Sequence, residues 1–93
     1  MRLTQYDLGF QEDGSIVEVT LEGTEANVQL LDSTALANYK ARRGYQYVGG
    51  HYRQSPVRLS VPHAGVWYVT VDLGGYVGTV RSGVRVIRAV TLP

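Results

Sequence analysis

Strict alternation of apolar and polar residues marks the second half of the chain, from Val57 to Val86. Between Val66 and Leu73 one set of alternate positions is apolar, whereas the other set carries Tyr68, Thr70 and Asp72. A period of two places the two sets on opposite faces of a half-buried β-strand. The pattern therefore predicts that Trp67, which belongs to the apolar set, packs in the core.

Two glycines follow this strand and favour a tight hairpin. Gly74 and Gly75 can adopt the positive φ angles that a two-residue type I′ turn requires at both central positions. The resulting register brings apolar residues together on the inner face. It places Leu73 opposite Tyr76, Thr70 opposite Thr79, Val69 opposite Val80, Tyr68 opposite Arg81 and Trp67 opposite Ser82.

The stretch from Val57 to Val61 alternates in the same way and is joined to Val66 by Pro62, His63, Ala64 and Gly65. Side-chain parity favours a hairpin with the three-residue loop His63-Ala64-Gly65, which pairs Leu59 with Val69. If the two strands lie in opposite sheets of a sandwich, the same residues form an arch and the parity argument does not apply.

The first half of the chain predicts two further strands and a lead-in segment. Residues Met1–Gly14 are expected to form a strand or a loop. Ile16–Leu21 alternates, with Val17 and Val19 inward and Glu18 outward. The turn residues Glu22–Glu25 then reverse the chain into a second strand, Ala26–Leu31.

A short helix is predicted after the second strand. Asp32 or Ser33 can cap it, because a side-chain oxygen there accepts hydrogen bonds from the free amides of the first turn over Thr34–Tyr39. An exposed basic connector, Lys40–Gly44, and an aromatic segment with a glycine break, Tyr45–His51, follow. Residues from Ile87 to Leu92 are apolar enough to complete a final strand.

These elements predict an all-β chain of six to eight short strands with at most one short helix. A small antiparallel β-sandwich, jelly-roll-like, fits this order best, and a small β-barrel is the alternative. The length of 93 residues is sufficient for one domain, residues 1–93. Ala26–Leu31 is expected to lie at a sheet edge, where it offers a route to a homodimer.

Composition narrows the setting. The chain has no cysteine, so disulfides and thiolate metal sites are excluded. Its first residues lack the pattern of a signal peptide, and no window approaches the length of a membrane span. We therefore expect a cytoplasmic protein that has no membrane association and no cofactor.

Charge is divided unevenly along the chain. Residues 1–32 carry one arginine and seven acids, a net charge of about −6, whereas residues 33–93 carry eight basic residues and one acid, about +7. Either acidic strands pack beside basic ones, or the fold has a basic face.

Several short motifs, taken together, resemble a bacterial family of unknown function, domain-of-unknown-function family 1883. The resemblance spans about Gly14 to Ile87 and rests on Leu30-Leu31-Asp32-Ser33, Gly49-Gly50-His51, Ser55-Pro56, Gly65 with Trp67, Asp72-Leu73-Gly74-Gly75, and Arg81-Ser82. It implies a small all-β domain with no assigned activity. Some members resemble partners of Toll/interleukin-receptor-type domains, which implies a sensing or recruiting role. The family supplies no catalytic residues.

No catalytic or metal signature emerges from the polar residues. His51 and His63 have no third ligand at a compact spacing. A triad can be drawn from Ser55 or Ser82 with His51 and Asp72, but the chain has no nucleophile-elbow motif. Asp72 is expected to bond turn amides, with an arginine as the rival partner. We therefore expect no catalytic and no metal-binding residues.

Interleaved basic and aromatic residues are the strongest functional hint. Arg and Tyr side chains on neighbouring strands could form a patch, but the residues favour the simpler interpretation that the tyrosines cover a sheet edge and the arginines pair with the acidic strands. The candidate ligand-binding residues are Tyr47, His51, Tyr52, Arg53, Arg58, Tyr68, Asp72 and Arg81, with Tyr45 and Arg85 nearby in sequence. The leading hypothesis is a non-enzymatic binding, sensor or interaction module for an anionic small molecule or a protein partner. The alternative is a single-stranded nucleic-acid-binding domain, in which arginines follow phosphates and rings stack on bases.

Overall fold

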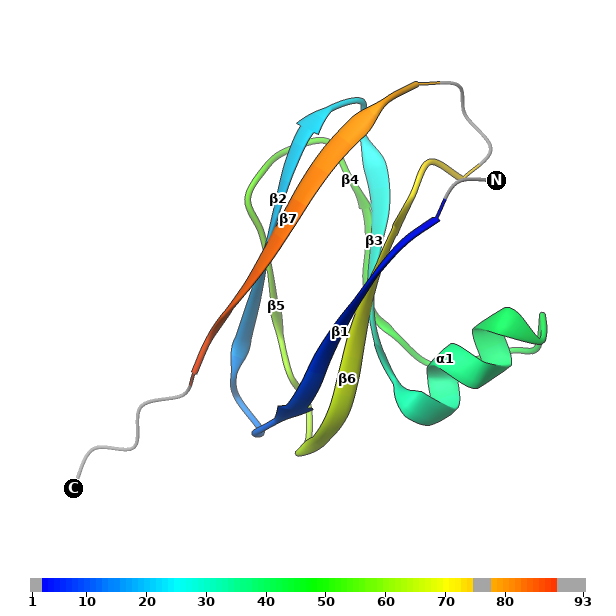
Figure 1. Cartoon of the computed structure of the whole chain (residues 1–93), viewed down its shortest axis with the longest axis vertical. Coiled ribbons are helices and arrows are strands. Elements are labelled where there is room, and N and C mark those ends of the chain that lie inside the picture. Colours follow the sequence, from blue (N-terminus) through cyan, green and yellow to red (C-terminus); the bar gives the residue numbers. More distant parts are fainter. Residues whose placement is uncertain (1–2, 75–77, 89–93) are drawn as a thin grey trace.

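A computed structural model describes residues 3–74 and 78–88, which form seven strands and one helix (Figure 1). The strands form two antiparallel sheets, one ordered β1-β6-β3-β4 and the other β5-β2-β7. Among the described residues no ladder joins the sheets, so the predicted sandwich is confirmed and the barrel is excluded. The elements are β1 (Leu3–Gln11), β2 (Ile16–Gly23), β3 (Ala26–Asp32), α1 (Ser33–Lys40), β4 (Val48–Tyr52), β5 (Val57–Ser60), β6 (Gly65–Asp72) and β7 (Val80–Ile87).

The core between the sheets consists of the side chains that alternation assigned to the inner face. Trp67 is 3% exposed, as predicted, and its Nε1 donates to the carbonyl of His63 at 3.0 Å. Full burial of a Val or Leu side chain contributes about 1.5–3 kcal/mol of transfer free energy. The same cluster contains Val17 and Val19 from β2, Val28 and Leu30 from β3, and Val69 and Val71 from β6.

Both predicted hairpins in the second half are wrong. β6 pairs with β1 and β3, whereas β7 pairs with β2, so the strands on either side of Gly74 lie in opposite sheets. Val69 therefore pairs with Tyr6 and Leu30 instead of Val80, and the predicted position of Tyr76 lies outside the described residues. β5 pairs with β2, so the connection to β6 is the arch, not the hairpin. The alternation of apolar and polar residues could not predict the pairing. Two strands that pack against each other from opposite sheets show the same alternation as two strands that pair within one sheet.

The strand Ala26–Leu31 is also placed differently from the expectation. β3 lies between β6 and β4, so it is an interior strand with both edges paired and cannot pair with a second copy. The glycine break in the aromatic segment is a strand as well, since Gly49 and Gly50 pair with Gln29 and Val28 inside β4. Gly49 has φ +132°, and a Cβ there would collide with the Val28 carbonyl oxygen. Gly49 therefore allows two strands to approach closely and does not form a turn.

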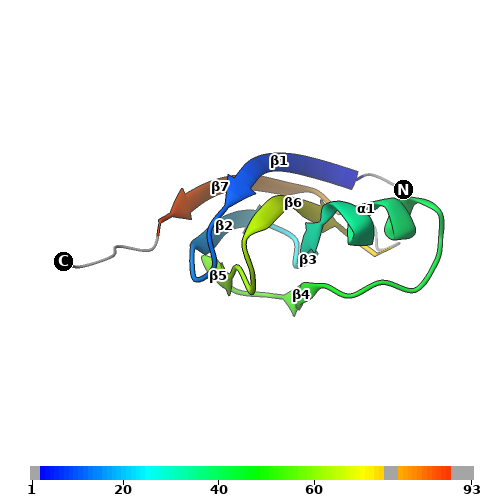
Figure 2. The ribbon, with the colours of Figure 1, turned by 90° about the horizontal axis from the view of Figure 1, so that it is seen from below.

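The lead-in segment forms the edge strand β1, which lies near the edge strand β7 of the other sheet (Figure 2). The Tyr6 hydroxyl donates to the Ser82 carbonyl at 2.9 Å and lies 2.7 Å from the Ser82 hydroxyl. These bonds tie the two sheets along one side. The predicted final strand extends to Ile87 in β7, and residues 89–93 lie outside the described residues.

The predicted helix is confirmed and packs on the outer face of the four-stranded sheet (Figure 1). Asp32 is its N-cap, and its Oδ1 accepts from the Ala35 amide at 2.8 Å. Leu31, Ala35 and Leu36 form a second buried cluster under the helix, against which Tyr39, Tyr45 and Tyr68 pack. Among the described residues no helix covers the outer face of the three-stranded sheet, so that face remains open to solvent.

Helix α1 is the longest helix among the described residues, and it is neither long nor apolar enough to cross a membrane.

Candidate functional site

The structure divides the candidate binding residues between the two sheets. Arg58 and Arg81 lie on the outer face of the three-stranded sheet, beside β2. The other candidates belong to the four-stranded sheet or the segments next to it: Tyr47, His51, Tyr52, Arg53, Tyr68 and Asp72. Arg58 and Arg81 therefore do not share a surface with the tyrosines, whereas Arg53 lies on their side of the sandwich.

Most of the candidates on the four-stranded sheet are engaged with protein partners. Asp72 Oδ1 accepts from the Gly74 amide at 2.7 Å and from Asn27 Nδ2 at 3.1 Å, which confirms the predicted bond to a turn amide. Asn27 Oδ1 in turn lies 2.9 Å from His51 Nδ1. Burial raises the pKa of the Tyr39 phenol under the helix, and the negative charge of Asp72 raises that pKa further.

Three more members of this group have contacts within the protein. Glu25 lies 3.5 Å from His51 Nε2 and 2.9 Å from Arg53 Nε. Tyr52 packs against the main core, and Tyr68 packs against the cluster under α1. Tyr47 and Arg53 are the exposed members, with 48% of Tyr47 and 81% of the Arg53 side chain exposed.

The guanidinium face is the outer surface of the three-stranded sheet, formed by Arg58, Arg81 and Arg85 with Glu18, Glu22, Thr20 and Gly83. Strand register places Glu18 between Arg58 on β5 and Arg85 on β7. Glu18 Oε2 accepts from Arg58 Nε at 3.0 Å, and Oε1 accepts from Arg85 Nε at 2.7 Å. Only 8% of the Glu18 side chain is exposed, although it projects from the outer face.

The two arginines beside Glu18 stabilise the ionised form of its carboxylate. The hydrogen bond from Arg85 lowers the pKa of Glu18 most, burial opposes that effect, and the bond from Arg58 and the charges of both arginines lower it further. Each guanidinium has five N–H donors and gives one of them to Glu18 in these bonds. The described residues accept no other hydrogen bond from Arg58 or Arg85, which leaves the other donors for an incoming acceptor.

A shallow groove crosses the guanidinium face at Gly83. Its two adjoining parts have volumes of about 530 Å³ and 250 Å³ and share Thr20 and Gly83, with Arg81 lining one part and Arg85 the other. A Cβ at Gly83 would lie only 3.0 Å from Thr20 Oγ1, so a side chain there would project into the groove. Among the described residues Arg81 forms no salt bridge, although register places it opposite Glu22.

The sequence-based prediction of site residues did not include Glu18, Thr20, Glu22 or Gly83, which also belong to this face. The signal was present in Arg81-Ser82-Gly83-Val84-Arg85, because a spacing of two places both arginines and the glycine on the same side of a strand. Glu18 lies between Val17 and Val19 and points outward. This pattern was the matching signal for a carboxylate that binds arginines of neighbouring strands.

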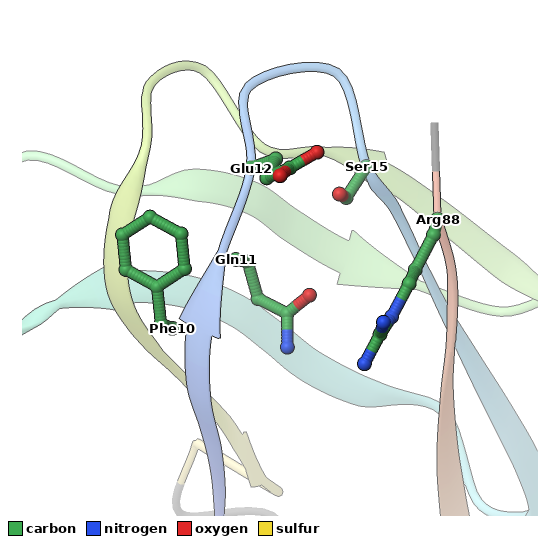
Figure 3. A pocket seen from close by; sticks show the side chains of 5 residues that line it. All are labelled: Phe10, Gln11, Glu12, Ser15 and Arg88. Atoms are coloured by element: carbon green, nitrogen blue, oxygen red, sulfur yellow. The ribbon is translucent and has the colours of Figure 1, made fainter. Parts of the chain in front are cut away.

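Another pocket lies at one end of the sandwich and has a volume of about 180 Å³ (Figure 3). The Phe10 ring, 64% exposed, stands on one side, and the Arg88 side chain extends from the other side toward Gln11. The Gln11 amide already donates to the Leu8 carbonyl at 2.7 Å, and Glu12 balances the charge of Arg88. This pocket offers less excess positive charge than the guanidinium face.

Ser55 and Ser82, the serines of the possible catalytic triads, form hydrogen bonds with other groups. Ser55 Oγ accepts from the Leu21 amide at 2.8 Å, and Ser82 lies against the Tyr6 hydroxyl. His51 and His63 are on different elements and contact different carboxylates, Glu25 and Asp32. Within residues 3–74 and 78–88, no three metal-ligating side chains gather at one point.

Comparison with known proteins gives a family but no characterised relative. Neither the curated proteins nor the solved structures contain a match to the chain. The family model described as domain of unknown function (DUF1883) matches residues 1–90, which extends beyond the stretch that the sequence motifs indicated. The chain therefore belongs to the DUF1883 family.

Proposed function

We propose that this DUF1883 domain is a non-catalytic interaction module whose guanidinium face binds an anionic ligand. The observation that carries the proposal is the placement of Arg81 and Arg85 on either side of the groove at Gly83, with Arg58 across Glu18 from Arg85, on a sheet face that no described helix covers. Guanidinium groups suit this task, because their planar fork matches the oxygens of carboxylates and phosphates.

Preorganisation supports the proposal further. Glu18 holds Arg58 and Arg85 through one Nε each, so these long side chains are already ordered before a ligand arrives. Ordering a flexible side chain on binding costs about 0.5–1.5 kcal/mol, and an arginine that is fixed in advance avoids part of this cost. Glu18 neutralises only one of the two positive charges that it holds, and Arg81, opposite Glu22, forms no salt bridge among the described residues.

The shape of the face favours an acidic segment of a partner protein over a small molecule. Small-molecule sites are usually concave and mostly apolar, and they enclose most of the ligand. The groove at Gly83 is shallow, runs across exposed strands and is bordered by charged residues. An extended chain with carboxylates at alternate positions would place them against the arginines on either side of Gly83.

A fluorescein-labelled polyglutamate peptide tests the proposal by fluorescence anisotropy. We expect binding at about 0.01 M salt that weakens strongly by about 0.15 M, since surface charges are then screened beyond about 8 Å. Arg81→Gln should weaken binding about tenfold or more, the loss of one hydrogen bond between charged groups. Arg43→Gln, an equal change of charge in the exposed connector after α1, is the matched control. Equal losses in the two variants, or no binding at low salt, would contradict the proposal.

The nucleic-acid alternative is tested in the same assay with a labelled oligothymidine. Base stacking needs aromatic rings beside the cations, and the described outward residues of β5, β2 and β7 include none. We therefore expect the oligonucleotide to bind no more tightly than the peptide. Tighter oligonucleotide binding that Tyr47→Ala weakens would favour the alternative.

A further inference from the structure

A separate cavity of about 290 Å³ opens at the end of the sandwich where β3 ends and β6 begins. Register pairs Asp32 with Trp67 there, and both residues carry the parity that faces the interior. We call this cavity the aromatic mouth; it is lined by Asp32, Gln46, Tyr47, Val48, Pro62, His63 and Trp67.

Hydrogen-bond acceptors meet across the aromatic mouth. His63 Nδ1 lies 3.2 Å from the Ala64 carbonyl oxygen, so in the neutral ring Nδ1 carries the proton and Nε2 is an acceptor. Nε2 faces Asp32 Oδ2 at 3.7 Å, which is too long for a direct hydrogen bond. Asp32 Oδ1 is already used by the Ala35 amide. In this form of His63, the two facing atoms both need a donor from outside.

Rings and charge define what kind of donor fits. Tyr47 is 48% exposed beside the mouth, and the His63 ring lies 4.9 Å from the Trp67 ring. With His63 neutral, Asp32 is the only charged residue among the described residues that line the mouth. A carboxylate next to aromatic rings attracts a cation, and a cation over a ring gains about 0.5–1 kcal/mol even at an exposed site.

We propose that the aromatic mouth binds a primary alkylammonium group. The ammonium has three N–H donors, enough to bond both Asp32 Oδ2 and His63 Nε2, while its methylene stem lies against Tyr47 and Pro62. A lysine side chain and a free small amine share this chemistry. The site is independent of the guanidinium face, which lies on the outer side of the other sheet and selects the opposite charge.

Trp67 supplies the readout, because it is the only tryptophan of the chain and lines the cavity. Its fluorescence should change saturably when n-butylamine is added, and n-butanol, which has the same stem without the charge, should have little effect. N-acetyl-lysine methylamide, added in a parallel titration, separates a peptide-borne lysine from a free amine. Equal responses to the amine and the alcohol would overturn the proposal.

Asp32→Asn removes the negative charge and keeps the helix cap. Asparagine caps helices about as well as aspartate, so circular dichroism should show an unchanged fold. We expect amine binding to fall about tenfold or more, which corresponds to about 1.4 kcal/mol. Asp13→Asn, at an exposed turn, is the matched control and should bind as the unmodified protein does. Unchanged binding in Asp32→Asn would exclude the carboxylate as the recognition group.

His63→Phe tests the second acceptor. The phenyl ring keeps an aromatic group beside Trp67 but removes both nitrogens, so weaker amine binding is expected. Tighter binding would mean that a protonated His63 occupies Asp32 itself, and the facing-acceptor argument would then be wrong.

Discussion

The two outer faces of the sandwich start from the same strand pattern and end in different environments. On the four-stranded sheet, α1 and the aromatic segment cover the outer face, and Leu31, Tyr68 and Asp72 are wholly or partly buried there. On the three-stranded sheet, no described helix covers the outer face, and Arg58 and Arg85 extend into solvent around Glu18. One face has become a second core, and the other presents charge.

This difference explains why polar residues at outward positions have such different partners. Thr70 is fully buried on the covered side, and its hydroxyl has no partner among the described residues. Asp72 is bonded to Asn27 and Gly74 on that same side. On the open side the arginines extend into solvent, as the proposed binding of an anion requires. The covered side contributes a second buried cluster instead.

The largest expected effect is a difference in the free energy of unfolding between side-chain truncations on the two faces. Leu31→Ala removes a fully buried side chain under α1 and should lower the free energy of unfolding by about 2–5 kcal/mol. Thr20→Ala, on the open face, should change it by about 0.5 kcal/mol or less, because surface substitutions rarely do more. Urea denaturation followed by circular dichroism measures both. Similar losses in the two variants would show that the faces are not energetically distinct.

A smaller effect concerns the buried carboxylate of the covered face. Asp72→Ala leaves the Gly74 amide and the Asn27 amide without their acceptor, which should cost about 1–3 kcal/mol. Arg81→Ala removes a charged side chain from the open face and should leave the free energy of unfolding within about 0.5 kcal/mol. The same denaturation experiment checks this pair. If Arg81→Ala proved the more destabilising change, the guanidinium face would have a structural role that its contacts do not show.

Local patterns in the sequence were sufficient for the elements and the core, but not for strand pairing. Alternation identified the inward residues correctly, and Asp32 identified the start of α1. The pairing at Gly74 could not be recovered, because a hairpin and an arch across the core are both compatible with inward apolar residues at alternate positions and with a flexible glycine. Only residues distant in sequence, such as Tyr6 and Leu30 beside Val69, determine which of them forms.

The candidate site was recovered in half for the same reason. Arginines and tyrosines interleave along the sequence, but the successive strands β5 and β6 belong to different sheets, so Tyr68 and Arg58 end on opposite faces. Glu18 could be assigned to an outward position, whereas its burial depends on two arginines about 40 and 67 residues away. Long-range register, and not residue type, decides which charges meet.

The most specific prediction concerns the acid dependence of the open face. Because the pKa of Glu18 is lowered in the folded state from its ordinary value of 4.5, its ion pairs contribute stability that is fully present above that value. This contribution is lost as the pH falls through the lowered folded pKa. Glu18→Gln should therefore be less stable than the unmodified protein near neutral pH, and the difference between them should shrink in acid. Urea denaturation at a series of pH values measures it.

Arg85 provides the internal check, because its hydrogen bond is the main cause of the lowered pKa of Glu18. In an Arg85→Gln background the Glu18→Gln substitution should have a smaller effect at neutral pH and a weaker dependence on pH. A difference that stays constant from about pH 7 to about pH 3 would mean that Glu18 is held by packing alone. The guanidinium face would then lack the charge coupling that keeps Arg58 and Arg85 in place, and its open donors would have to be ordered by the ligand itself.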